Sequence, residues 1–122
     1  MKETEGHLLR VFIGEADRYD GKPLYQWIVQ KARAMGLSGA TVTRGIVGFG
    51  ADSRVIHSAN VLRLSGDLPI VVEIVDTEEK LGNFLGVIDQ TITGGLATIE
   101  KVRIHIYRSS DSRDGDPSST SD

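Results

Sequence analysis

Cysteine is absent from the 122 residues of the chain. This absence excludes disulfide bonds, thiolate zinc sites and cysteine nucleophiles. It also fits a reducing compartment, so we expect a cytoplasmic protein. Histidine is scarce as well, and His7, His57 and His105 lack the spacing of a metal site. We therefore expect no bound metal.

Long hydrophobic runs and an excess of positive charge are also missing. The longest apolar stretches, such as residues 70–72, are too short to span a bilayer, and residues 1–7 lack the apolar core of an export signal. We expect no direct membrane insertion. The net charge is −3, and residues 109–122 carry all of it, so the remaining chain is neutral. A neutral body lacks the basic surface of a nucleic-acid binder, so no nucleic acid partner is predicted.

The composition predicts one domain with two short ends. Residues 109–122 are rich in serine and aspartate and contain no large apolar side chain, which predicts a disordered acidic tail. Residues 1–7 are predicted to be a flexible N-terminus. The domain spans residues 8–108, which is long enough to bury a modest core without metal or disulfide support.

Hydrophobic periodicity within this domain predicts four strands and two helices. Apolar and β-branched runs place the strands at residues 8–13, 40–49, 68–75 and 97–108. The expected helices run from Pro23 to a stop at Gly36, and from a capping-box-like pair, Asp76 and Glu79, to a stop at Gly94 and Gly95. Between the second and third strands, residues 51–67 form a long connection of the kind that is often functional.

The element order β-α-β-β-α-β is typical of a ferredoxin-like α+β sandwich, in which both helices cover one face of an antiparallel four-stranded sheet. The strands, however, are apolar on both faces. In the first strand, for example, Leu8 and Phe12 oppose Leu9, Val11 and Ile13. Because two helices cover only one face, we predict that copies of the chain bury the other in a homo-oligomer.

Glycines and cations near the ends of these elements are the candidate ligand site. Glycine lets a ligand approach the main chain, and arginine and lysine stay charged at neutral pH, so such residues could hold an anion. The candidate ligand-binding residues are Arg44, Gly48, Phe49, Gly50, Gly94, Gly95, Lys101 and Arg103. In the alternative interpretation, the glycines end a strand and a helix, and the cations solvate an exposed face.

The long connection contains an apolar residue among polar ones. We predict that Arg54, Ile56 and His57 contact a partner protein there, since an exposed apolar residue can anchor an interface. Ser53 and Ser58 lie near His57 but lack an orienting acid and an oxyanion site, so no catalytic residue is predicted.

Several strings of residues occur in a characteristic order along this domain. They are Gly14-Glu15 with Asp17-Arg18, Gly21-Lys22-Pro23-Leu24-Tyr25, Gly39-Ala40-Thr41-Val42 with Arg44-Gly45-Ile46, Gly48-Phe49-Gly50, and Leu68-Pro69-Ile70-Val71-Val72-Glu73. In these strings the chain resembles the domain of unknown function 190 family, which is similar to the PII signalling proteins. The resemblance extends over residues 8–108.

The resemblance implies a PII-like homotrimer with small-molecule sites in the clefts between subunits. No cofactor is certain, and an adenine nucleotide is the implied effector, held near Gly48-Phe49-Gly50. The following T-loop, residues 51–67 here, would signal to a regulated partner, such as a membrane transport protein. The chain departs from the PII pattern at Asp52, where PII proteins usually carry glutamine, and at residues 93–96, which lack the lysine of the Gly-Asp-Gly-Lys phosphate signature.

A non-enzymatic PII-like regulatory protein is the leading interpretation. A ligand-free oligomeric scaffold is the main alternative. An acylphosphatase-type enzyme shares the strand order, but residues 14–21 lack the glycine pattern of its phosphate loop. An RNA-recognition module would need aromatic residues on the central strands, which here are mainly aliphatic.

Overall fold

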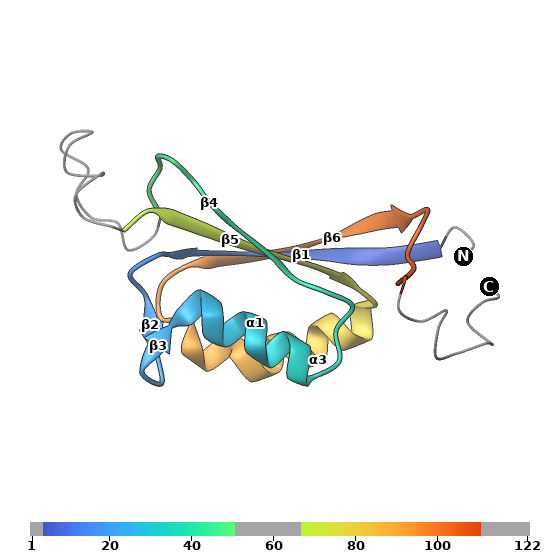
Figure 1. Cartoon of the computed structure of the whole chain (residues 1–122), viewed down its shortest axis with the longest axis horizontal. Helices are drawn as coiled ribbons and strands as arrows, with labels where there is room; N and C mark the ends of the chain where they lie inside the picture. Colours follow the sequence, from blue (N-terminus) through green and yellow to red (C-terminus); the bar gives the residue numbers. More distant parts are fainter. Residues whose placement is uncertain (1–3, 51–66, 111–122) are drawn as a thin grey trace.

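The computed structural model describes residues 4–50 and 67–110, whose main body is a four-stranded antiparallel sheet in the order β4-β5-β1-β6 (Figure 1). The elements are β1 (Thr4–Gly14), β2 (Arg18–Tyr19), β3 (Lys22–Pro23), α1 (Leu24–Ala34), β4 (Thr41–Arg44), β5 (Pro69–Asp76), α3 (Glu78–Ile88), the 3-10 helix η1 (Asp89–Thr91) and β6 (Leu96–Ile104). The predicted ferredoxin-like α+β sandwich is thereby confirmed.

Both helices lie against the same face of the sheet, as Figure 1 shows. Buried and half-buried residues alternate along β1 and β5, because successive side chains of a strand point to opposite faces. The buried core is Leu9, Val11 and Ile13 of β1, Ile70, Val72 and Ile74 of β5, Leu24, Ile28 and Ala32 of α1, and Leu81, Phe84 and Ile88 of α3. One continuous core thus joins the helices to the two central strands.

Strand β4 is shorter than the predicted strand over residues 40–49, since it ends at Arg44. The strand ends there because of its partner strand, β5. The last pair of the ladder joins Arg44 to Ile70, and the Gly45 N–H still donates to the Pro69 carbonyl at 2.7 Å. Proline has no N–H group to donate the next hydrogen bond of the ladder, so the strand pairing stops there. Residues 45–50 consequently leave the sheet, and the glycine-rich segment is irregular backbone rather than strand.

Strand β1 begins earlier than predicted, at Thr4 instead of Leu8, because residues 4–7 pair with residues 101–104 of β6. The prediction of a flexible N-terminus over residues 1–7 is corrected accordingly for residues 4–7. A Cβ added at Gly6 would lie 2.6 Å from the Ile104 Cδ1 atom, so a larger residue there would require the Ile104 side chain to move.

Strand β6 ends at Ile104 rather than at Arg108, and its last pair joins Ile104 to Thr4 of β1. Ile106 and Tyr107 are exposed, and the Tyr107 hydroxyl donates to the Ser38 carbonyl. Residues 111–122 of the predicted tail lie outside the described residues.

The cap of α3 lies one residue later than predicted. The Thr77 hydroxyl accepts from the Lys80 N–H at 3.2 Å, which makes Thr77 the N-cap. The Asp76 carboxylate instead accepts from the N–H groups of Thr77 and Ser38, so it ties the start of α3 to the connection that follows α1. Helix α3 also ends earlier than predicted, at Ile88, and η1 continues the chain.

A hairpin formed by β2 and β3 precedes α1, where the sequence suggested only a polar turn. Asp20 and Gly21 connect its strands, both with positive φ (54° and 77°). Two consecutive residues of this kind form a type I′ turn, whose twist matches that of a hairpin. Asp-Gly is the sequence signal for it.

Candidate functional site

A pocket of about 420 Å³ lies at the end of the sheet where β1 ends and β6 begins. It brings together four predicted ligand-binding residues from two distant parts of the sequence, namely Phe49, Gly50, Gly94 and Gly95. The remainder of its lining comes from the end of β1, the turn after it and the start of β5 and β6. The pocket is therefore a product of the fold rather than of one loop.

Two glycines permit the main chain to close around this pocket. A Cβ on Gly95 would lie 2.6 Å from the Phe12 carbonyl oxygen, so only glycine fits against β1 at that position. Gly48 has a φ of 154°, which L side chains rarely adopt, and its nearest neighbour is the Pro69 ring. Gly48 thus lies beside the pocket, because Pro69 belongs to the lining.

The polar part of the lining is acidic. The Asp17 carboxylate accepts from the Gly14 N–H at 3.0 Å, and the Asp67 carboxylate accepts from the Ala16 N–H at 3.3 Å. Both carboxylates lie near the Gly14 Cα, where an added Cβ would be 2.6 Å from the Asp67 Oδ1 atom. Neither Asp17 nor Asp67 is among the ligand-binding residues predicted from the sequence. Their place in the pocket lining follows from the hydrogen bonds that their carboxylates accept from the main chain at the end of β1 and in the turn after it.

Arg44 does not line the pocket. Its guanidinium forms an ion pair with the Glu15 carboxylate at 2.7 Å, which anchors the end of β4 to the turn after β1. Its side chain remains more than half exposed. Within residues 4–50 and 67–110, the pocket lining contains no lysine or arginine. The candidate cation nearest to the glycines in sequence is therefore held by a carboxylate outside the lining.

Lys101 and Arg103 lie at the opposite end of β6 from the pocket. Leu96 is opposite Phe12 at the pocket, whereas Lys101 is opposite His7 and Arg103 is opposite Glu5. At about 3.3 Å per residue, Lys101 is roughly 17 Å along the strand from Leu96. One chain thus does not bring these cations to the glycines.

The predicted partner-contact residues Arg54, Ile56 and His57 lie outside the described residues. In the part of the chain that the structure does describe, no cluster of histidine, aspartate and glutamate side chains could hold a metal ion. No helix among the same residues is long and apolar enough to cross a membrane.

The fold is shared with solved structures of PII-like proteins. CPII from Thiomonas intermedia, bound to ADP and bicarbonate, matches with a TM-score of 0.62 and 15% identity, over 86% of this chain and 93% of CPII. A protein of Thermus thermophilus described as PII-like and signalling matches with a TM-score of 0.60 and 20% identity, over 86% of this chain and 94% of that one. At these identities the likeness concerns the fold alone.

The chain belongs to the DUF190 family of uncharacterised proteins, whose model matches residues 6–104. A UPF0166 protein of Aquifex aeolicus is 39% identical over 107 residues, which cover 85% of this chain and 97% of the relative. The resemblance drawn from the sequence motifs is thereby confirmed.

Proposed function

We propose that this protein is a PII-like regulator that assembles as a homotrimer, binds a small anionic effector at the pocket and signals to a partner protein. An adenine nucleotide is the effector we favour. Segment 51–67 remains the predicted partner-contact region. The protein acts by binding, and we assign it no catalytic residue.

The meeting of the Phe49-Gly50 and Gly94-Gly95 segments in one pocket carries this proposal. The pocket volume of about 420 Å³ lies within the range of small-molecule sites. Phe12, Phe49 and Leu96 offer apolar surface suited to a purine ring, and the Asp17 carboxylate could accept hydrogen bonds from ribose hydroxyls. In support, the CPII structure of the same fold holds ADP and bicarbonate.

The phosphates of such a nucleotide require cations that the described lining of one chain lacks. We propose that Lys101 and Arg103 of a neighbouring subunit supply them. These residues lie on the edge strand β6, far from their own pocket but accessible at the rim of the sheet. Each site would then consist of glycines from one subunit and cations from the next.

Isothermal titration of the protein with ATP, ADP, AMP and cyclic adenine dinucleotides tests the proposal. Phe49→Ala removes a pocket side chain that is 76% exposed and not part of the core, so it should weaken binding about tenfold or more without unfolding the chain. Ile46→Ala is the matched control, because Ile46 is still more exposed and does not line the pocket. Absence of heat and of a thermal shift with every nucleotide would remove the proposed effector.

Mixed oligomers test whether neighbouring subunits share a site. Phe49→Ala damages the glycine side of a site, and Lys101→Gln damages the cation side. If two subunits share each site, co-refolded mixtures of the two variants regain intact sites that neither variant has alone. Mixtures that bind no better than the separate variants would show that the cations do not act across subunits.

The acidic lining favours one alternative, the ligand-free oligomeric scaffold. Asp17 and Asp67 would repel an anion placed beside them, and no lysine or arginine of the described lining offsets them. The same titration decides between the two functions. Hydrolysis of benzoyl phosphate is the corresponding test for an acylphosphatase-type activity, and we expect none.

A further inference from the structure

The sheet face that the helices leave open carries mainly apolar side chains and threonines, with charged side chains only at its centre. Its half-buried or exposed apolar positions are Leu8, Phe12, Val71, Val75, Leu96, Val102 and Ile104. Among the strand positions of this face in the described residues, three are charged. They are Arg10 on β1, Glu73 on β5 and Glu100 on β6.

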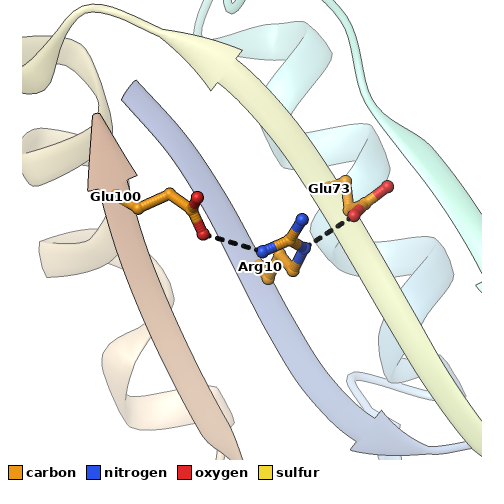
Figure 2. A network of polar contacts seen from close by, with 3 residues as sticks. All are labelled: Arg10, Glu73 and Glu100. Carbon is orange, nitrogen blue, oxygen red and sulfur yellow. Dashed lines mark hydrogen bonds and ion pairs between the residues drawn. The ribbon is translucent and has the colours of Figure 1, made fainter. Parts of the chain in front are cut away.

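Figure 2 shows Arg10 between the two glutamates. The Arg10 Nε–H group donates to Glu73 at 2.8 Å, and the Nη1–H group donates to Glu100 at 2.9 Å. The hydrogen bond that Arg10 donates to the Glu73 carboxylate is the main cause that raises the pKa of Arg10 above its ordinary value. The arginine therefore stays charged, and this triad combines one positive with two negative charges.

The triad is self-complementary in hydrogen bonding but not in charge. Arg10 has further N–H groups on Nη1 and Nη2, and each glutamate has a second oxygen, so a copy of the same face could exchange hydrogen bonds with it. Each copy nevertheless brings a net charge of −1 into an otherwise uncharged surface. Burial of that excess charge disfavours association until it is neutralised.

We infer that the Arg10–Glu73–Glu100 triad couples assembly of this protein to proton uptake, with copies of the chain joining their open faces more tightly when one glutamate is protonated. The inference rests on the homo-oligomer of the proposed function. We expect a second copy of the chain to cover the open face, because strands that are apolar on both faces require cover. The triad can also exchange hydrogen bonds with the same triad of another copy. The other open-face positions beside the triad, Thr41, Thr43 and Thr98, carry no charge.

Sedimentation velocity over a range of protein concentrations, at about pH 5.5 and about pH 8.5, tests this coupling. If joining the faces takes up a proton, association should be at least about tenfold tighter at the lower pH than at the higher pH. Glu100→Gln keeps an acceptor for Arg10 but removes the excess charge. It should therefore associate at least about tenfold more tightly than the wild type at the higher pH, with a reduced pH dependence.

Two further variants complete the design. Glu79→Gln is the matched control, since Glu79 is exposed on α3 and the same charge is lost away from the sheet, so it should behave as the wild type. Arg10→Gln leaves two unneutralised glutamates and should associate most weakly. Where the oligomer is too tight to dissociate, native mass spectrometry of subunit exchange with isotope-labelled protein gives the same comparison. Wild-type exchange should be faster at the higher pH, and Glu100→Gln should exchange slowly at both.

Association of the wild type that does not change with pH, or a Glu100→Gln variant no tighter than the wild type at the higher pH, would overturn the inference. A monomer at all concentrations would overturn it together with the proposed oligomer. These measurements contain no nucleotide. A pH-coupled oligomer that binds no nucleotide would therefore refute the proposed effector and leave the coupling intact.

Discussion

Replacement of Gly95 by alanine is predicted to destabilise the protein, whereas the same change at Gly50 is not, although both glycines line the pocket. A Cβ on Gly95 would lie 2.6 Å from the Phe12 carbonyl oxygen and 3.2 Å from the Ile92 Cγ2 atom. Phe12 cannot easily move, because β1 is paired with a strand on each side. A Cβ on Gly50 would meet no heavy atom within 4 Å.

The expected magnitude follows from the cost of overpacking, which is about 1–3 kcal/mol for a group forced into a packed site. For a domain of this size, that cost lowers the melting temperature by roughly 5–15 °C. Gly50→Ala should change the free energy of unfolding by less than about 0.5 kcal/mol, or raise it slightly by restricting the unfolded chain.

Urea unfolding monitored by tryptophan fluorescence measures both variants. Trp27 is the only tryptophan of the chain, and it packs against the core from α1, so its emission reports on the whole domain. All samples need the same protein concentration, because assembly raises apparent stability. A Gly95→Ala midpoint equal to that of the wild type, or an equal loss in Gly50→Ala, would refute the reasoning.

Three further predictions concern the core, a helix cap and a charged group. Phe84→Ala should lower the free energy of unfolding by about 3–5 kcal/mol, since Phe84 is fully buried between α3 and the sheet. Circular dichroism melts should show a large drop in melting temperature for this variant and none for the control Asn83→Ala, because Asn83 is exposed. Thr77→Ala should lower the free energy of unfolding, measured by urea titration, by about 1 kcal/mol, because the Lys80 N–H loses its acceptor. Thr77→Ser keeps the hydroxyl and should retain most of the stability. The pKa of Arg10 is raised on folding, so its stabilising effect is complete below its ordinary pKa and is lost only as the pH rises through the raised value. The stability difference between the wild type and Arg10→Gln should accordingly stay constant from about pH 8 to about pH 10, and a steady decline over that window would contradict the assignment.

Hydrophobic periodicity predicted the fold because the buried residues of this domain follow the regular repeats of a helix and of a strand. Helical spacing marked the core positions Leu81, Phe84 and Ile88 of α3, and alternation marked those of the strands. Strand ends were less predictable, since each depends on a partner that is distant in sequence. Pro69 ends β4 from the opposite strand, and the start of β1 depends on its pairing with residues 101–104 of β6.

The candidate site was predictable only in part for the same reason. Glycines at element ends have a local signal, so Phe49, Gly50 and Gly94 could be assigned to one site from the sequence and the family resemblance. Asp17 and Asp67 have no such signal, because their carboxylates reach the pocket through main-chain contacts with the turn after β1. The triad at Arg10 likewise arises from the register of three strands.

The register of β6 has a consequence for any effector. Leu96 lies at the pocket and Arg103 lies at the far end of the same strand, so a rigid strand cannot present both to one ligand. If the glycines and the cations form one anion site, that site exists only where two chains meet. Effector affinity must then fall when the protein is diluted below its assembly concentration, because each lone chain retains an acidic pocket without its cations. Titrations above and below that concentration should therefore differ, and an affinity that is independent of dilution would show that the pocket of a single chain is sufficient.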